Sequence, residues 1–353
     1  MKKLLYILIA VALVGCEQYE HTLAYGGDIE FSAGIVSRGA VSQGNIFDRS
    51  NSLVQLYATL NDAAIDKLND KELTRDNTTG KWFTTNNIND RPEWKTGNYS
   101  FHAYARNPRT GNGLTISNNG LEITVSQPAS YNESAMIDYL LSYVFKATRT
   151  DNNSPKPLVQ IQLEHAMSAV DVYVVKGNNF DARLTSLTLR NIYRQGTMKC
   201  TSQATANSGE RNVWEIQPSG SNNTVYTFST PEDNAITIGT SREDTNAKMS
   251  ILCLPQQLTA STELEIRYQV NEKYSSSSPD RWVDHTETFQ LYNYNPMNYQ
   301  PGHRVIYTVT VDSGVNLEGT VTAWKDVDYI EGTVLPSIPS GDDNNDNNEN
   351  VEE

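Results

Sequence analysis

Residues 99–105, Tyr99-Ser100-Phe101-His102-Ala103-Tyr104-Ala105, alternate along the chain between two kinds of side chain. Apolar residues occupy every second position from Tyr99, and the more polar Ser100, His102 and Tyr104 occupy the positions between them. Successive side chains of a β-strand point to opposite faces of its sheet, so a period of two residues indicates a half-buried strand. The stretch therefore predicts a strand with one face in a core.

The same alternation recurs along most of the chain and predicts an all-β fold. The further apolar series are Val54/Leu56/Ala58/Leu60, Leu121/Ile123/Val125, Val159/Ile161/Leu163, Val170/Val172/Val174, Leu187/Leu189, residues 249–254, Leu264/Ile266/Tyr268/Val270, Val305/Tyr307/Val309/Val311 and Leu317/Val321/Ala323. Helix signals are sparse: Asn61-Asp62 predicts the cap of a short helix through Leu68, and Asn132-Glu133-Ser134 the start of another through Leu140. Many short strands joined by polar turns are typical of β-sandwiches.

The length of the chain predicts two tandem domains. About 320 residues are too many for a single hydrophobic core. The clearest internal boundary is the segment 151–157, in which four polar turn residues lead into Pro155 and Pro157. We therefore expect an N-terminal β-sandwich over residues 30–152 and a C-terminal β-sandwich over residues 153–335.

The amino terminus has the composition of an export signal. Lys2 and Lys3 precede an apolar run that ends in Leu13-Val14-Gly15-Cys16. This run is shorter than the roughly 20 residues that a membrane-spanning helix needs. A cysteine after Leu-Val-Gly resembles a bacterial lipobox, in which the peptide is cut before a lipidated cysteine. Residues 1–15 are thus predicted to be a lipoprotein signal peptide, Cys16 the lipidation site and residues 16–29 a tether; an ordinary signal peptide with a chance cysteine is the alternative.

The charge of the chain excludes one class of partner. The formal net charge is −14, and removal of residues 1–15 would take away Lys2 and Lys3 and make it −16. Nucleic-acid binders carry a basic footprint, so an acidic chain argues against nucleic acid. Residues 336–353 end in a run of Asp, Asn and Glu with almost no apolar side chain, which predicts a disordered acidic tail. Asp343, Asn345 and Asn347 have the spacing of calcium ligands, but the rest of a calcium loop is missing.

Residues for catalysis or metal binding do not converge in the sequence. Cys200 and Cys253 form no C-x-x-C pair. They are either buried free thiols or joined to each other by a disulfide. No nucleophile elbow or phosphate-binding loop is present. We expect no enzyme, no cofactor and no metal site. The five histidines lack metal-ligand spacing and are expected to be surface or hydrogen-bonded structural residues: His21, His102, His165, His285 and His303.

Tyrosine is the unusual feature of the composition, with 19 residues. Tyr292, Tyr294 and Tyr299 cluster in a loop before a strong strand. Aromatic side chains on an exposed loop can stack on sugar rings or anchor a protein partner. Alternatively, they cover the edge of a sandwich. The first interpretation makes these three tyrosines candidate contact residues.

Several segments, taken in order behind the lipobox, resemble the fimbrillin family of lipoproteins from gut and oral Gram-negative anaerobes. The resemblance covers most of residues 30–330. The segments that carry it are Ser37-Arg38-Gly39-Ala40, residues 98–108, Asp138-Tyr139-Leu140-Leu141, residues 163–170, Leu254-Pro255-Gln256-Gln257, residues 301–307 and Ala323-Trp324-Lys325-Asp326.

The resemblance implies transthyretin-like sandwiches and a role in fimbriae. In such families the precursor is anchored by lipid to the outer membrane, at the cell surface, and an arginine-specific protease then removes its first strand. An extended segment of the next subunit fills the groove, which satisfies the unpaired backbone groups and the apolar slot. Arg38 matches the cleavage position and Arg49 is a second candidate; an uncut, exposed arginine is the alternative. The implied partners are other fimbrial subunits and a host protein or glycan.

The carboxyl terminus departs from the pattern of a stalk subunit. A donor segment must be apolar, whereas residues 340–353 are acidic and rich in asparagine; Val327 to Leu335 has the required character. A stalk, tip, anchor or non-polymerising role therefore stays open. Two functions follow: a fimbrial structural or adhesive lipoprotein assembled by strand addition, or a surface glycan-binding lipoprotein that does not polymerise and uses the exposed tyrosines.

Overall fold

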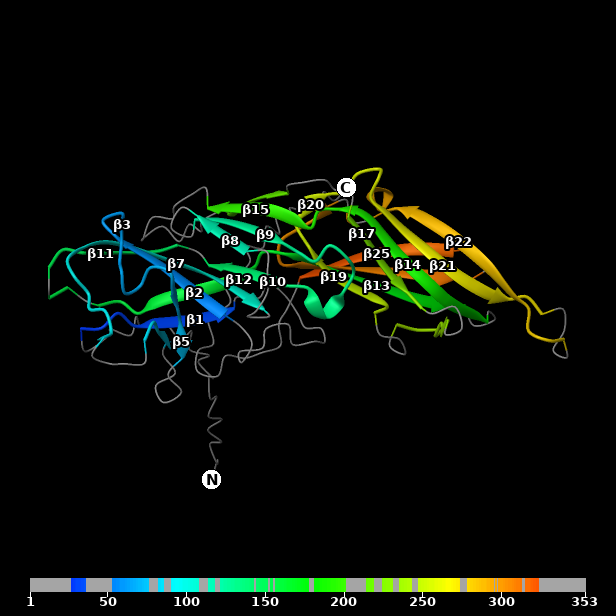
Figure 1. The fold of residues 1–353 in the computed structure, drawn as a ribbon, viewed down its shortest axis with the longest axis horizontal. Coiled ribbons are helices and arrows are strands. Elements are labelled where there is room, and N and C mark those ends of the chain that lie inside the picture. Colours follow the sequence, from blue (N-terminus) through cyan, green and yellow to red (C-terminus); the bar gives the residue numbers. More distant parts are fainter. Residues whose placement is uncertain are drawn as a thin grey trace, which may run out of the picture.

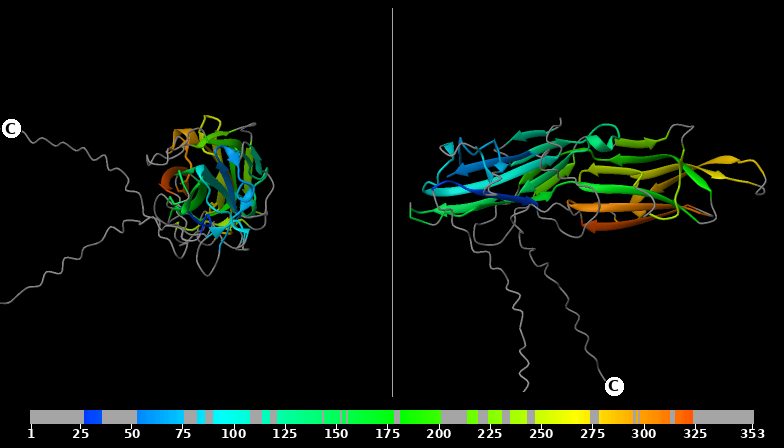
Figure 2. Two further views of the ribbon diagram at one scale, coloured as in Figure 1. Left: turned by 90° about the vertical axis from the view of Figure 1, so that its left-hand side faces the viewer. Right: turned by 90° about the horizontal axis from the view of Figure 1, so that it is seen from below.

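The computed structural model describes a large part of the chain as an elongated β-protein (Figures 1 and 2). The described residues are 27–35, 53–75, 82–85, 90–107, 114–117, 121–142, 144–151, 153–154, 156–177, 181–200, 214–218, 224–230, 235–242, 247–273, 278–294, 296, 298–312 and 315–323. Regular structure in these ranges consists of strands and the two 3₁₀ turns Glu133–Ala135 and Leu291–Asn293. They contain no helix with the length and apolarity of a membrane span. The predicted all-β fold is confirmed.

One large sheet forms the end of the molecule at the left of Figure 1. Its strand order is β3-β2-β7-β10-β12-β1-β6-β5, with β11 also paired to β7 and β4 to β2. The stretch at residues 99–105 lies in β7, which pairs with β2, β10 and β11. The strands are β1 (Phe31–Ile35), β2 (Leu53–Leu60), β3 (Ala63–Ala64), β4 (Lys71–Glu72), β5 (Thr74–Arg75), β6 (Trp82–Phe83), β7 (Gly97–Asn107), β10 (Asp138–Ser142), β11 (Phe145–Arg149) and β12 (Val159–His165).

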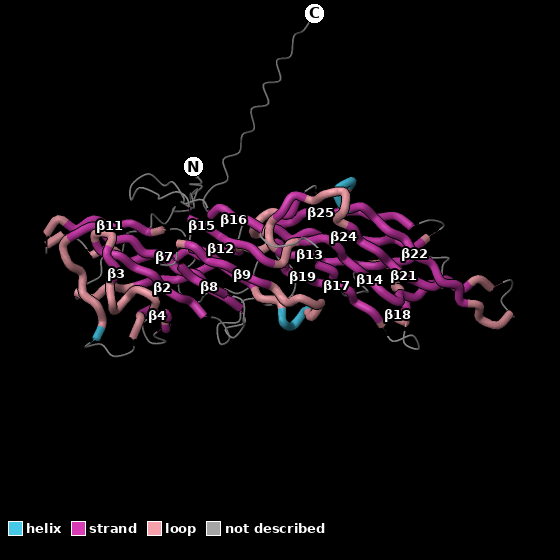
Figure 3. Tube along the Cα trace, turned by 45° about the horizontal axis from the view of Figure 1, so that its top comes forward, coloured by secondary structure: helices cyan, strands magenta, loops and turns pink. Residues whose placement is uncertain are grey.

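Two sheets pack face to face at the other end of the molecule (Figure 3). The first has the order β19-β13-β24-β25 and the second β17-β14-β21-β22, with β18 also paired to β14. Their strands are β13 (Ser168–Lys176), β14 (Ala182–Ile192), β17 (Thr224–Ser229), β18 (Ile236–Thr237), β19 (Met249–Cys253), β21 (Glu263–Asn271), β22 (Trp282–Gln290), β24 (His303–Val311) and β25 (Val315–Ala323). The remaining strands are β8 (Leu114–Ser117), β9 (Glu122–Ser126), β15 (Gln195–Cys200) and β16 (Trp214–Pro218), in the order β16-β15-β9-β8, and the pair β20 (Gln256–Gln257) and β23 (Asn298–Tyr299).

The apolar face of β7 forms the centre of the first core. Tyr99, Phe101, Ala103 and Ala105 are all buried, as their alternation predicts. The ring of Phe101 stacks on Tyr99 at 5.6 Å and meets Phe31 and Trp94 edge-on, each at 5.8 Å between centroids. Full burial of one such side chain contributes about 1.5–3 kcal/mol. This cluster fixes β7 and β1 against each other.

The opposite face of β7 is also buried at His102 and Tyr104, which the sequence did not predict. His102 is 3% exposed and its ring stacks on Tyr57 at 5.6 Å, so His102 is a core residue and not a surface one. Tyr57 and Tyr104 share a second core with Ile123 of β9 and Met198 of β15. Alternation shows that a strand has two faces, but the second face is covered here by strands from distant segments.

Strand pairing joins the two halves of the chain. β9 pairs with β15 from Ser126↔Gln195 to Glu122↔Lys199. β12 follows the segment 151–157 and pairs with β10 and β1 of the first sheet. Strands from before and after residue 152 are therefore hydrogen-bonded to each other, although the sequence predicts a domain boundary there. The division into two sandwiches stays a prediction.

Both predicted helices are wrong. Asn61 and Asp62 have φ angles of 49° and 65°, which places them in a left-handed turn before β3. Asn and Asp tolerate this region because their short polar side chains bond locally. Residues 133–135 form a single 3₁₀ turn, and Leu140 lies in β10, where it is fully buried between its neighbours in the sheet. Sheet pairing and burial override the local helix signals at both places.

We predict that replacing Ile123 by alanine destabilises the whole protein. Ile123 is 1% exposed and belongs to the core that both halves share. The free energy of unfolding should fall by about 2–4 kcal/mol, since a buried isoleucine side chain leaves a cavity. Thr124→Ala is the matched control, because Thr124 is the exposed neighbour on the same strand and should change stability by less than about 0.5 kcal/mol. Urea unfolding curves measure both; equal effects would contradict the shared core.

Candidate functional site: the slot occupied by strand β1

Strand β1 is held along one of its two edges. It pairs in parallel with β12, from Phe31↔Val159 to Ile35↔Leu163, and the amide of Val159 donates to the carbonyl of Glu30 at 2.9 Å. Among the described residues, its other edge pairs at Phe31 alone, with Trp82 of β6. Parallel pairing is slightly less stable per residue than antiparallel pairing. The backbone of β1 is thus bound less strongly than that of a central antiparallel strand.

Apolar side chains supply the rest of the attachment of β1. Phe31 is fully buried, Ile29 is 1% exposed, and both belong to the first core. The amide of Ile29 donates to the carbonyl of Pro92 at 2.8 Å. Because the buried Val159 and Ile161 of β12 lie in the same core, removal of β1 would leave an apolar slot beside an unpaired strand edge.

The chain between β1 and β2 contains both candidate cleavage residues. β1 ends at Ile35 and β2 begins at Leu53, so Arg38 and Arg49 both fall in the connection between them. A cut after either residue would separate β1 covalently from the rest of the sheet. Arg38, Arg49 and the lipidation candidate Cys16 lie outside the described residues, and their roles stay predictions.

The three candidate tyrosines do not form one surface. Tyr292 is 40% exposed on the 3₁₀ turn Leu291–Asn293. Tyr294 is half-buried and meets Phe289 edge-on at 6.0 Å. Tyr299 is 2% exposed, its hydroxyl lies 3.3 Å from that of Tyr307, and burial raises its pKa well above the ordinary value. Tyr299 is therefore a core residue and not a contact residue, because β23 pairs it into the structure; Tyr292 and Tyr294 stay predictions.

The described histidines have structural surroundings. Nδ1 of His165 lies 2.9 Å from a carboxylate oxygen of Asp138, and both side chains are buried. Nδ1 of His303 lies 2.8 Å from the carbonyl of Pro301, and His285 stacks on Tyr268 at 5.3 Å. The described part of the chain brings together no three His, Cys, Asp or Glu side chains that could hold a metal. The Asp138–His165 pair was missed, because their 27-residue separation carries no signal and Asp138 lies in a stretch expected to be helical.

Cys253 is a free, buried thiol. Burial raises the pKa of this thiol, which keeps it protonated and unreactive at neutral pH. The side chain of Cys200 lies outside the described part of the structure.

The described residues form packed β-sheets, and β1 pairs along one edge with β12 and at one residue of its other edge with β6. The model of the fimbrillin-like family matches residues 49–324. This chain belongs to the fimbrillin-like family.

Solved structures are similar to this chain at low sequence identity, and the first of those below shares its fold. A candidate cell adhesion protein from Bacteroides uniformis is 13% identical, with a TM-score of 0.51, over 85% of this chain and 100% of that one. A second candidate cell adhesion protein, from Bacteroides ovatus, is 17% identical, with a TM-score of 0.48, over 85% and 99%. A fimbrial protein from Bacteroides vulgatus is 14% identical, with a TM-score of 0.46, over 84% and 99%. No curated protein matches the chain significantly.

Membership of this family supports a fimbrial subunit role. It implies a location at the cell surface or in a fimbrium and association with other fimbrial subunits. The family also indicates a structural protein and not an enzyme.

We predict that Phe31→Ala weakens the attachment of β1 more than it weakens the rest of the sheet. Loss of a fully buried phenylalanine ring costs about 3–5 kcal/mol, and the backbone of β1 is paired along one edge. Amide hydrogen exchange should therefore accelerate in β1 while β7 and β2 stay protected. Ser32→Ala, at the neighbouring half-buried position, is the control. Uniform acceleration over all three strands would show that β1 does not open separately.

Proposed function

We propose that this chain is a fimbrial subunit or fimbria-associated adhesive lipoprotein that assembles by strand addition after proteolytic removal of β1. The observation that carries the proposal is the attachment of β1 itself. This strand fills an apolar slot, pairs in parallel along one edge and is joined to β2 by a connection that contains Arg38 and Arg49. Its departure would also release the short strands β6 and β5, which, among the described residues, join the sheet through the pair Phe31↔Trp82.

The slot sets the requirements for the strand that replaces β1. The incoming segment must pair with β12 and place a large apolar side chain where Phe31 packs against Phe101. In this chain, Val327 to Leu335 has the apolar composition of such a donor, whereas the acidic residues beyond it do not. Because slot and donor are different surfaces, the contact is heterologous and can extend into a filament.

The proposal places the precursor on the outer membrane through lipid on Cys16. The apolar run before Cys16 and its position after Leu-Val-Gly support this anchor. Cleavage at Arg38 or Arg49 would remove the lipid together with β1, since both precede β2. One cut then releases the subunit from the membrane and opens its slot, which couples release to assembly.

Arginine-specific proteolysis of the purified full-length precursor tests the proposal. We expect a cut after Arg38 or Arg49, identified by mass spectrometry of the new amino terminus, followed by filaments in electron micrographs. Arg38→Lys and Arg49→Lys preserve the charge and remove the cleavage residue. The variant at the true site should stay monomeric, and the other should assemble like the unaltered chain.

Two results would contradict the proposal. The first is filament growth in the double variant with β1 retained. The second is a chain that is cut between β1 and β2 and never assembles, even at high concentration, which would leave a surface lipoprotein that does not polymerise.

A further inference from the structure

The outer face of the sheet β17-β14-β21-β22 carries mostly polar side chains. Its inward positions, such as Leu187, Leu264 and Ile266, are buried in the second core. The outward positions lie side by side across the strands in five rows: Val225, Arg190, Glu263 and Gln290; Thr227, Thr188, Glu265 and Thr288; Ser229, Ser186, Arg267 and Thr286; Arg183, Gln269 and Asp284; Asn271 and Trp282. We call this surface the polar face.

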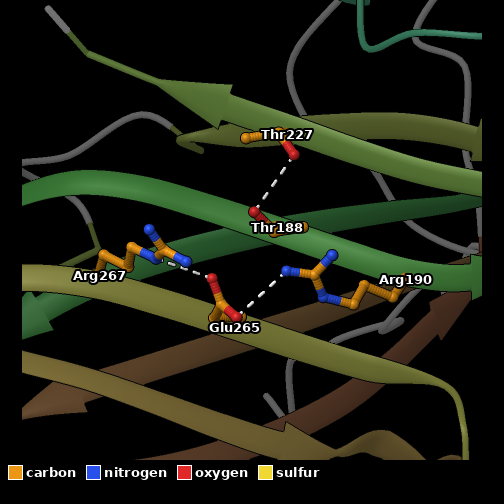
Figure 4. A network of polar contacts seen from close by, with 5 residues as sticks. All are labelled: Thr188, Arg190, Thr227, Glu265 and Arg267. Carbon is orange, nitrogen blue, oxygen red and sulfur yellow. Dashed lines mark hydrogen bonds and ion pairs between the residues drawn. The ribbon is translucent and has the colours of Figure 1, made fainter.

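Two arginines and a carboxylate form the centre of the polar face (Figure 4). Arg190 Nη2 donates to one oxygen of Glu265 at 3.1 Å, and Arg267 Nε donates to the other at 2.9 Å. On the neighbouring strands β14 and β17, the hydroxyl of Thr188, which is buried beneath its neighbours, lies 3.2 Å from that of the exposed Thr227. Burial raises the pKa of Glu265, but the two arginine hydrogen bonds outweigh it and hold the pKa below its ordinary value. The carboxylate is therefore ionised at neutral pH and keeps both guanidinium groups in place.

A second array crosses three strands of the polar face. Arg183 Nε donates to Oε1 of Gln269 at 2.6 Å, and Nε2 of Gln269 donates to Oδ1 of Asp284 at 2.7 Å. The guanidinium of Arg183 also lies over the ring of Trp282, 4.2 Å from its centroid. These contacts hold long side chains in defined positions. A ligand that binds there loses less side-chain entropy than it would on a mobile surface.

The charge of the polar face differs from that of the whole chain. Its three arginines, Arg183, Arg190 and Arg267, balance Glu263, Glu265 and Asp284, and none of its positions is a lysine. The chain as a whole carries a net charge of −14. A neutral surface on an acidic protein favours neither a cationic nor an anionic partner.

We propose that the polar face binds a neutral oligosaccharide. Sugar hydroxyls both donate and accept hydrogen bonds, and the face offers guanidinium donors beside carboxylate, amide and hydroxyl acceptors. Strands about 4.8 Å apart place these groups in adjacent rows, and Trp282 adds one aromatic ring. A protein partner would require an apolar centre, and Val225 and Trp282 are the apolar residues among these positions. The inference rests on the adhesive part of the proposed function and specifies its ligand class.

The test is binding of the full-length chain to a printed array of neutral oligosaccharides, including N-acetyllactosamine and mannose-rich chains, with sialylated and sulfated chains as acidic probes. We expect binding to a neutral chain that persists in about 0.5 M NaCl, where charges are screened beyond about 4 Å. Arg267→Ala/Asp284→Ala changes two exposed residues, one in each array, and should weaken binding at least about tenfold. Glu318→Ala/Thr322→Ala, at exposed positions of β25 in the opposite sheet, should leave binding unchanged.

Three outcomes would overturn the inference. These are no binding to any neutral chain, equal binding by the two double variants, or salt-sensitive binding restricted to the acidic probes. The melting temperature of each variant confirms that it is folded. Protease-triggered filament growth is measured on the same variants. Normal filaments without sugar binding would refute the ligand class alone, and sugar binding without filaments would refute polymerisation alone.

Discussion

The slot beside β12 must be filled, and much of this structure follows from that requirement. Val159 and Ile161 are buried in the first core, and Phe31 of β1 closes that core against Phe101. A strand edge with unpaired amides next to exposed apolar side chains is costly in water and promotes association with another strand. β1 satisfies both needs through one row of backbone pairs and its apolar side chains. We propose that the same slot accepts a strand of the same chemistry from another molecule.

The two halves of the chain are connected more firmly than a flexible linker would connect them. β9 pairs with β15, and Tyr57 and Tyr104 of the first sheet share a core with Ile123 and Met198. Force applied at one end of the elongated body therefore passes through hydrogen-bonded strands and not through the segment 151–157 alone. Such a body suits a subunit in a filament. The polar face lies on the sheet at the end away from β1 (Figure 1).

Much of the strand content could be predicted from local alternation, and the pairing could not. Every apolar series proposed from the sequence lies at least partly in a strand, because one buried face leaves a period of two in the residues. β22 carries polar residues at most positions and therefore lacks the period of two in apolar residues. The alternation in β7 does not show that His102, on the other face of the strand, is buried too. In the candidate site, Arg38 and Arg49 were found by resemblance and lie outside the described residues. The parallel partner of β1, more than 120 residues away, has no local signature.

The occupant of the slot beside β12 can be identified in an assembled filament by electron cryomicroscopy. We expect a strand from a neighbouring subunit, with an apolar side chain against Phe101 and no density that connects this strand to residues 36–52 of the same chain. Assembly by strand addition would be refuted by a filament in which each subunit keeps its own Phe31 in the slot.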